Sequence, residues 1–288
     1  MILVTGAGGF IGRRVCAQLL RENLPFLGVD RRPPAPSMGS WRTVDVTDRG
    51  AVAGLFRSYS LDTVIHLAAM LPSACRLDPS QATAVNIAGS ANLLEAAAAA
   101  RVKRFVFGSS MSVYGHAGDG TPLSEDAAAA PVDLYGAGKR YVEIYGETLA
   151  RRGALSFVAL RIATVVGPGA RHTASPWRSE IFEKVGSGVP QTIAIPFSAE
   201  AILSLVHVED VARMLVLLAT RADAPAAVYN TPAESWTPGA LKRFVEGLDH
   251  NVTVELGGAG QTATPPVADG ARFVRDFAWH ASTIASWY

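Results

Sequence analysis

The chain has 288 residues, of which 49% are hydrophobic and 18% charged, and its formal net charge is +1 at pH 7. This composition supplies a buried core and excludes an intrinsically disordered chain, and the balanced charge gives no support for binding to nucleic acid or to an anionic membrane. No apolar run reaches about 18 residues and no charged segment precedes the apolar start, so we expect no signal peptide, no membrane span and a cytoplasmic protein. The two cysteines, Cys16 and Cys75, lack metal-ligand spacing, so we expect buried reduced thiols and no metal site.

Short apolar runs alternate with helical patterns over the first two thirds of the chain. Six of these runs predict strands, at residues 2–5, 25–30, 41–46, 63–68, 104–110 and 156–162. Helical patterns between them predict helices at residues 11–22, 48–58, 80–100 and 135–152. Continuous apolar strands suit a parallel sheet covered on both faces, and their alternation with helices predicts an α/β fold with a Rossmann-like, doubly wound sheet.

The regular alternation weakens after residue 166. We expect a helix over 173–190, a helix over 209–220, a short strand over 228–232 and a loop over 257–270. The sequence therefore predicts a chain divided into a domain and a smaller lobe. They are an NAD(P)-binding Rossmann domain of residues 1–166 plus about 201–225, and a small C-terminal substrate lobe of about 167–200 plus 226–288.

A glycine-rich turn, "VTGAGGFIG", joins the first predicted strand to the first helix. It carries three spaced glycines, Gly6, Gly9 and Gly12. A dinucleotide site needs glycine there for a tight turn, for close approach of a pyrophosphate and for close contact between helix and strand. Asp30 ends the second strand, where a carboxylate can accept hydrogen bonds from a ribose diol. Arg31 and Arg32 could instead bind a 2′-phosphate, but Asp30 would repel it, so we expect NAD, with NADP as the alternative.

Eight ordered motifs, spread over nearly the whole chain, resemble the extended branch of the short-chain dehydrogenase/reductase superfamily, which holds the NAD-dependent sugar epimerases and dehydratases. The motifs are "TGAGGFIG" (5–12), "VDVTD" (44–48), "HLAA" (66–69), "VNIAGSANLLEAA" (85–97), "SSMSVYG" (109–115), "YGAGK" (135–139), "LRIATVVGPG" (160–169) and "HVEDVA" (207–212). Any one of them is weak, but their order identifies the family.

The resemblance implies that Tyr135 is the catalytic acid/base, that Lys139 is its partner, and that Ser110 hydrogen-bonds the reacting carbonyl or alcohol. Tyr135 and Lys139 lie four residues apart and so share a helical face. A cation within about 4–6 Å, helped by an oxidised nicotinamide, should favour the phenolate of a side chain whose ordinary pKa is near ~10. The neighbouring Gly136 and Gly138 each cost about 1 kcal/mol in a helix, and we expect them to permit close approach of the cofactor and of other backbone.

The same resemblance assigns residues around the cofactor and the substrate. Besides the glycines, Asp30, Arg31, Tyr135 and Lys139, the cofactor set is Phe10, Ile11, Asp45, Val46, Leu67, Ala68, Ala69, Asn86, Ser109, Ile162 and Thr164. The substrate candidates are Met70, Met111, Ser112, Arg171 and Arg178. His66 is expected to be a hydrogen-bonded structural histidine.

Two positions depart from the sugar-nucleotide members of the family. Thr164, three residues after Arg161, stands where those members usually carry asparagine, and Leu203 stands where many carry arginine. Each missing charge-assisted contact is worth about 1.5–3 kcal/mol. The run 160–182 instead resembles the erythronate and uronate types of sugar-acid dehydrogenase, in which Arg171 and Arg178 would bind a carboxylate or a single phosphate. That both are solvated loop charges is an equal alternative.

We therefore expect an NAD(P)-dependent oxidoreductase of the sugar epimerase/dehydratase kind, acting by hydride transfer at a secondary alcohol or ketone of a sugar or sugar nucleotide. The alternative is a sugar-acid or aldose dehydrogenase that gives net NADH. A non-catalytic dinucleotide-binding regulator is less favoured, because such chains commonly lose the Tyr/Lys pair. Helices 80–100 and 135–152 resemble those of a four-helix dimer interface, so we expect a homodimer.

Overall fold

The structure is a computed structural model that describes residues 1–32, 39–116, 120–170, 174–221, 224–258 and 264–288. Its first part alternates strands and helices in the order that the sequence predicts. The strands are β1 (Ile2–Thr5), β2 (Phe26–Asp30), β3 (Ser40–Thr43), β4 (Thr63–His66), β5 (Arg104–Ser110) and β6 (Ser156–Ile162). The helices are α1 (Phe10–Arg21), α2 (Arg49–Ser58), α3 (Pro72–Leu77), α4 (Pro79–Thr83), α5 (Ser90–Ala99) and α6 (Leu134–Arg151).

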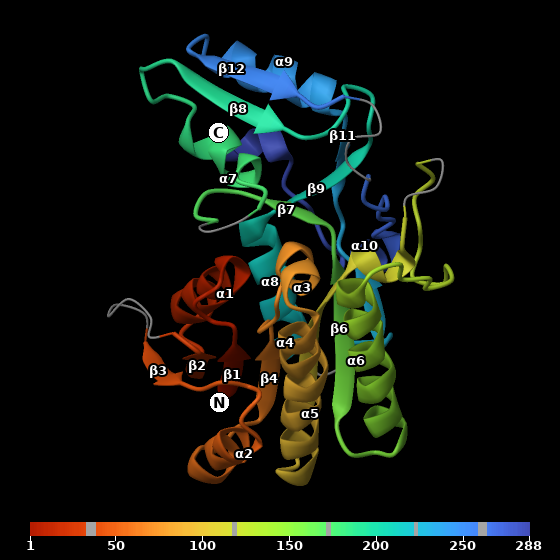
Figure 1. Cartoon of the computed structure of the whole chain (residues 1–288). Coiled ribbons are helices and arrows are strands. Elements are labelled where there is room, and N and C mark those ends of the chain that lie inside the picture. Colours follow the sequence, from red (N-terminus) through yellow and green to blue (C-terminus); the bar gives the residue numbers. More distant parts are fainter. Residues whose placement is uncertain (33–38, 117–119, 171–173, 222–223, 259–263) are drawn as a thin grey trace.

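A seven-stranded sheet forms the centre of the molecule, with strand order β10-β6-β5-β4-β1-β2-β3, where β10 is Val228–Asn230. All its neighbouring strands are parallel. Helices α1 and α8 (Val208–Thr220) pack together on one face, and α2, α5 and α6 cover the other (Figure 1). The predicted α/β, doubly wound fold is confirmed. Because the strand order reverses between β1 and β4, the crevice that binds ligands in such sheets lies at the carboxyl ends of these strands.

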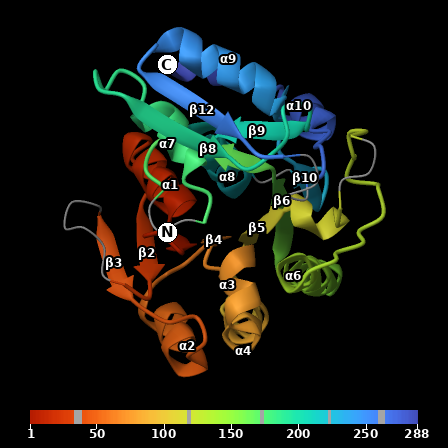
Figure 2. The ribbon, with the colours of Figure 1, turned by 45° about the horizontal axis from the view of Figure 1, so that its top comes forward.

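The second part of the chain builds two small sheets and a second apolar core. One sheet holds β7 (Thr164–Val166), β9 (Leu203–His207) and β11 (Glu234–Trp236), and the other holds β8 (Gln191–Ile195) and β12 (Val252–Leu256). The helices here are α7 (Trp177–Glu183), α9 (Pro238–Leu248) and α10 (Ala271–Phe277). Figure 2 shows β8, β12 and α9 lying together above the carboxyl ends of the large sheet. Their apolar side chains pack around the buried Trp177.

Several elements of this second part differ from the prediction. The helix expected over 173–190 is short, because the chain turns at Gly186 and Gly188, both at positive φ, and continues as β8. The sequence reasoning did not foresee the small sheets or α9. Strand β10 joins the large sheet beside β6, although residues after 226 were assigned to the substrate lobe. The division into two units therefore remains a proposal.

The third predicted strand and the two cysteines can be compared directly with the prediction. The expected strand 41–46 ends at Thr43, and the Asp45 carboxylate then accepts hydrogen bonds from the Thr47 amide and hydroxyl, which close a turn. Cys16 and Cys75 are free and buried. Over the described ranges, no helix is long and apolar enough to cross a membrane, and no group of three or more His, Cys, Asp or Glu is arranged to hold a metal.

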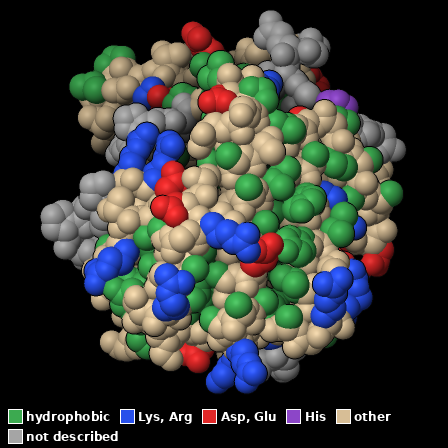
Figure 3. All heavy atoms as spheres, turned by 60° about the horizontal axis from the view of Figure 1, so that its bottom comes forward, with side chains coloured by type: hydrophobic (Ala, Val, Ile, Leu, Met, Phe, Trp, Pro, Cys, Tyr) green, Lys and Arg blue, Asp and Glu red, His purple; other side chains and the backbone are tan. Residues whose placement is uncertain are grey.

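One face of the molecule carries a mixed surface. Figure 3 brings the bottom of Figure 1 forward and shows hydrophobic side chains gathered across the middle of this face, with Lys and Arg side chains around them. Helix α6 contributes large exposed hydrophobic residues, among them Tyr141 and Ile144, which are 47% and 48% exposed.

Candidate active site

The glycine turn between β1 and α1 leaves no room for side chains. Gly6 has φ +66°, and a Cβ on it would lie 2.6 Å from the Ala68 nitrogen. A Cβ on Gly12 would collide with the Gly6 carbonyl oxygen. Gly9 caps α1 without a side-chain hydrogen bond, so the first-turn N–H groups point to the turn and suit an anion there.

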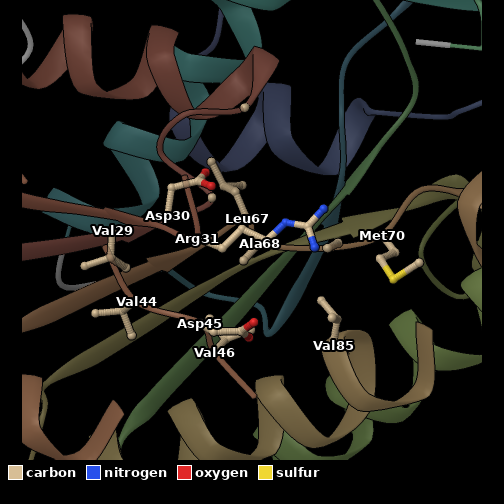
Figure 4. A pocket seen from close by; sticks show the side chains of 13 residues that line it. Val29, Asp30, Arg31, Val44, Asp45, Val46, Leu67, Ala68, Met70 and Val85 are labelled. Atoms are coloured by element: carbon tan, nitrogen blue, oxygen red, sulfur yellow. The ribbon is translucent and has the colours of Figure 1, made fainter. Parts of the chain in front are cut away.

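A pocket opens beside this turn, and half of the predicted cofactor residues line it (Figure 4). The predicted cofactor residues in its lining are Gly6, Gly9, Asp30, Arg31, Asp45, Val46, Leu67, Ala68 and Ala69. Met70, predicted to contact substrate, also lines it, together with three valines that the sequence reasoning did not assign to a site, Val29, Val44 and Val85. Their signal was their position beside Asp30, Asp45 and Asn86, but valines in strands and helices are usually core residues.

The Asp30 carboxylate is already ordered by the glycine turn. Its Oδ2 accepts a hydrogen bond of 3.0 Å from the Gly8 amide, and its Oδ1 accepts one of 3.3 Å from the Arg32 amide. In Figure 4 the Arg31 side chain extends from the end of β2 across the pocket. The Asp30 carboxylate thus lies beside the glycine turn, and the Arg31 guanidinium lies farther along the pocket toward Met70.

Asn86 fixes the loop that follows β4. Its Oδ1 accepts a 2.7 Å hydrogen bond from the Met70 amide, and its Nδ2 donates a 3.0 Å bond to the Met70 carbonyl oxygen. Asn86 lies in a π-helical segment, Ala84–Gly89, between α4 and α5. Such turns are rare and often occur at functional sites.

His66, at the end of β4, is fully buried, and both its ring nitrogens have hydroxyl partners. One lies 2.6 Å from Thr5 Oγ1 and the other 2.9 Å from Ser90 Oγ, as a structural histidine requires.

Ser110, Tyr135 and Lys139 come together from β5 and the first turns of α6. The Asp133 carboxylate caps α6 through a 2.7 Å bond from the Gly136 amide, which fixes the first turn. The Ser110 hydroxyl lies close enough to Tyr135 to lower the pKa of that phenol, and its Oγ accepts a 3.1 Å hydrogen bond from the Ser112 amide.

Lys139 is almost completely buried, and its Nζ donates a 2.6 Å hydrogen bond to the Gly108 carbonyl oxygen. The ammonium also lies 4.7 Å from the centre of the Phe107 ring, a cation–π contact. Burial lowers the pKa of Lys139 to about 8, although the Glu143 carboxylate partly opposes this shift.

The pKa of Tyr135 differs from the sequence expectation. Burial raises the pKa of this phenol to about 12, against the smaller lowering effects of the Ser110 hydrogen bond and the Arg178 charge. Lys139 is not among the causes of this shift, although its Nζ lies 5.6 Å from the centre of the Tyr135 ring. The protein alone therefore holds Tyr135 as a neutral phenol at neutral pH.

A buried ionic network lies behind these residues. Arg161 on β6 forms two hydrogen bonds to Glu143 on α6, of 2.9 and 2.8 Å, and both side chains are buried. The Ser109 hydroxyl donates a 2.6 Å bond to the same carboxylate, so the side chain of this predicted cofactor residue is turned into the network. The sequence reasoning did not single out Glu143. Its signal was an acidic residue one helical turn after Lys139, on the face that α6 turns to the sheet.

The remaining predicted residues lie in different surroundings. Met111 is buried beside Ser110, and Ile162 is buried at the end of β6. Phe10 and Ile11 begin α1 and pack partly against the core. Arg171 lies outside the described residues.

The two departures from the sugar-nucleotide pattern both have a packing explanation. Thr164 is buried in β7 and pairs with Leu205 of β9. Leu203 is completely buried in the apolar core of the second part of the chain. An arginine at position 203 would bury a charge in this core, so packing explains the leucine there.

Comparison with known proteins finds relatives for most of this chain. The model of the NAD dependent epimerase/dehydratase family matches residues 2–231. A UDP-glucuronate 4-epimerase from Thermodesulfobacterium geofontis is 35% identical over 193 residues, which cover 61% of this chain and 59% of that protein. A UDP-glucose 4-epimerase from Rhizobium meliloti is 28% identical, over 70% of this chain and 60% of its own. The chain thus spans less than two thirds of the length of these curated relatives.

Solved structures match almost the whole chain. MoeE5 in complex with UDP-glucuronic acid and NAD is 30% identical, with a TM-score of 0.83 and coverage of 98% of this chain and 94% of its own. The Thermus thermophilus UDP-glucose 4-epimerase in complex with NAD is 26% identical, with the same TM-score and coverage. The family model spans most of the sequence and these structures share its fold, so the chain belongs to the NAD dependent epimerase/dehydratase family.

Proposed function

We propose that this protein is an NAD-dependent enzyme that oxidises a secondary alcohol of a sugar or sugar nucleotide, or reduces the corresponding ketone. The observation that carries the proposal is that Ser110 and Lys139 both lie close to Tyr135, and that Tyr135 belongs to an apolar cluster against which Met70 packs, a residue that lines the pocket beside the glycine turn. Family membership supports the same chemistry, and the 4-epimerases among its relatives support a sugar-nucleotide substrate.

The residues fit NAD. Gly6, Gly9 and Gly12 form a cradle that any Cβ would fill, and Asp30 stands where it can accept hydrogen bonds from a ribose diol. When bound, NAD would supply the acceptor for the hydride and a positive charge near the phenol. Asp30 would repel a 2′-phosphate, which favours NAD over NADP, while Arg31 keeps NADP as the alternative.

The protein side chains have separate tasks in this mechanism. Tyr135 removes the proton from the substrate hydroxyl during oxidation and returns it during reduction. Ser110 hydrogen-bonds the reacting oxygen and holds it beside the phenol. Lys139 provides a buried positive charge one turn away. Since burial raises the pKa of Tyr135 to about 12, the phenol is a good proton donor in the reducing direction and needs added positive charge to act as a base.

The net reaction distinguishes two candidates. An epimerase or dehydratase returns the hydride to the substrate, so NADH does not accumulate. A sugar-acid or aldose dehydrogenase releases a ketone or lactone and accumulates NADH. The buried Thr164 and Leu203 favour this second candidate, because they replace polar residues of sugar-nucleotide members.

The test follows NADH absorbance and product formation with NAD or NADP. The panel pairs free sugar acids and aldoses with UDP- and dTDP-sugars. We expect conversion of at least one sugar, with NAD preferred.

The Tyr135→Phe variant tests the catalytic role of the phenol. It should lower kcat by at least about 100-fold, the scale of acid/base catalysis, and leave NAD affinity within about twofold. Retained turnover in this variant would remove Tyr135 from the mechanism.

We also propose a homodimer formed through α4, α5 and α6. The exposed Leu134, Tyr141 and Ile144 of α6 support it, as does the alanine-rich surface of the neighbouring α5. The Tyr145 hydroxyl donates a 3.0 Å hydrogen bond to Glu95, which ties α6 to α5 as one face. Two copies of this face would complete a four-helix interface.

A further inference from the structure

Glu143 places a completely buried carboxylate in α6, one helical turn after Lys139. Its Oε1 accepts hydrogen bonds from the Ser109 hydroxyl at 2.6 Å and from Arg161 Nε at 2.9 Å. Its Oε2 accepts two more, from Arg161 Nη2 at 2.8 Å and from Arg140 Nη1 at 2.9 Å. A buried charge is tolerated where such donors compensate it, so the interior behind the site holds a lasting negative charge.

This carboxylate is joined to the strand end that carries the catalytic groups. Ser109, which donates to Glu143, lies between Gly108 and Ser110 in β5. The Gly108 carbonyl oxygen accepts the 2.6 Å hydrogen bond from Lys139 Nζ. Successive residues of a strand face opposite sides, so Ser109 turns to the carboxylate while Ser110 turns to the phenol of Tyr135. One short stretch of backbone thus connects the negative charge to the cation and to the hydroxyl of the site.

Among the described residues, the other titratable groups that interact with Lys139 are neutral at pH 7. Burial raises the pKa of the Tyr135 phenol to about 12, raises the pKa of the Cys75 thiol, and lowers the pKa of the His66 imidazole to about 3. Burial also lowers the pKa of Lys139 to about 8, and the Glu143 carboxylate opposes this shift. Glu143 is therefore the anion that stabilises the ammonium.

An ion pair that only joined α6 to β6 would need Glu143 and Arg161 alone, and an apolar pair of similar volume could pack there equally well. The bond from Ser109 and the position one turn after Lys139 are extra features of this carboxylate. We propose that Glu143 is a positioning residue for catalysis, whose carboxylate keeps the Lys139 ammonium charged beside Tyr135. This inference rests on the proposed function and adds to it a residue that touches neither substrate nor cofactor.

Titration of Lys139 by nuclear magnetic resonance tests the proposal without any substrate. The chain has only four lysines, which are Lys103, Lys139, Lys184 and Lys242. Labelling of lysine with carbon-13 at Cε therefore gives few signals, and the signal missing from Lys139→Met belongs to Lys139. In the wild type we expect a midpoint of about 8 for this signal. In Glu143→Gln the midpoint should fall by at least about one pH unit, the scale of losing a nearby opposite charge.

Glu147→Gln is the matched control, because it makes the same substitution one turn further along α6, and it should leave the Lys139 midpoint unchanged. If Glu143→Gln does not fold, the double variant Glu143→Gln/Arg161→Met decides, since it leaves neither charge of the pair buried alone. Its midpoint should fall in the same direction. An unchanged midpoint in the variant that folds, or an equal fall in Glu147→Gln, overturns the proposal.

Turnover then shows whether the charge on Lys139 matters for the reaction. For a sugar that the wild type converts, the ratio of kcat in Glu143→Gln to kcat in the wild type should fall between pH 6 and pH 8, as Lys139 of the variant loses its proton. A constant ratio would remove Glu143 from the mechanism. A lower midpoint with no conversion of any sugar by the wild type would leave the effect of Glu143 on Lys139 standing and remove the proposed function.

Discussion

Lys139 shows how a functional group is kept at a cost to stability. Its ammonium is 5% exposed and is bonded to a single backbone oxygen, that of Gly108. A fully apolar side chain of similar length would fill the same space without a buried charge. Burial lowers the pKa of Lys139 to about 8, so at neutral pH the folded protein holds this unfavourable charge, as a site for catalysis requires.

Replacing Lys139 should therefore stabilise the protein while it removes activity. The ordinary lysine pKa is near ~10.4, so between pH 8 and 10.4 the unfolded chain binds more protons than the folded one, and wild-type stability rises with pH. Lys139→Met should be more stable than the wild type at pH 7, and its advantage should shrink by pH 9.5. Each unit of pKa difference corresponds to about 1.4 kcal/mol. Urea unfolding at both pH values measures this.

Lys103→Met is the control for that experiment, since it removes a lysine whose side chain is 82% exposed. An advantage of Lys139→Met that stays constant from pH 7 to 9.5 would mean that Lys139 is not a strained cation in the folded protein.

Two glycines in the first turns of α6 have different reasons to be there. A Cβ on Gly136 would collide with the Ser112 carbonyl oxygen and lie 3.2 Å from Pro131 Cβ, so the close approach of another backbone excludes a side chain. A Cβ on Gly138 would only touch Asn86 and Ile87 at 3.6 Å, an ordinary contact. The protein packing thus explains Gly136 but not Gly138.

Alanine substitutions should separate the two positions. Gly136→Ala should destabilise the protein by about 1–3 kcal/mol, because it overpacks a site that contains backbone. Gly138→Ala should stabilise it by roughly 0.5–1 kcal/mol, because alanine favours a helix. Urea unfolding of both variants provides the test, and equal effects would contradict it. NAD titration of Gly138→Ala then shows whether the second glycine is kept for the cofactor.

The elements around the cofactor were predictable because their signals are local. The glycine turn, Asp30 and the apolar strands follow from spacing and period, whereas the other predicted cofactor residues of the pocket came from the family resemblance. The π-helical segment at Ala84–Gly89 was not predictable in this way. Its formation brings Asn86 to the Met70 backbone, a contact between segments 16 residues apart that no helical period records.

Several elements of the second part of the chain were not predicted, for a related physical reason. Strands β7, β9 and β11 are only three to five residues long and pair with distant partners, so their sequence carries little period. The α7 prediction ran on to residue 190 because the two turn glycines, Gly186 and Gly188, were read as part of a helix. Arg178 was a candidate from its type and place, but the burial of its Nε without a hydrogen-bond partner appears only in three dimensions.

At the scale of the whole molecule, the two parts are joined close to the site. Strand β6 of the large sheet leads directly into β7, and β9 leads directly into α8. The α1 helix adds further ties, since Arg13 donates to the Gly169 carbonyl oxygen and Arg14 to that of Pro168. The segment after β7 is thus anchored to the helix that follows the glycine turn.

The proposed dimer makes the last prediction. Ile144 is 48% exposed in the middle of the α6 face, and burying it between two copies would remove apolar surface from water. Ile144→Glu would place two carboxylates in that interface, so we expect a shift from dimer to monomer at micromolar concentration in sedimentation velocity. Val189→Glu, at an exposed valine before β8, adds the same charge away from this face and should stay dimeric. A wild-type monomer at micromolar concentration would refute the dimer. A dimer unaffected by Ile144→Glu would show that the interface does not include this face of α6.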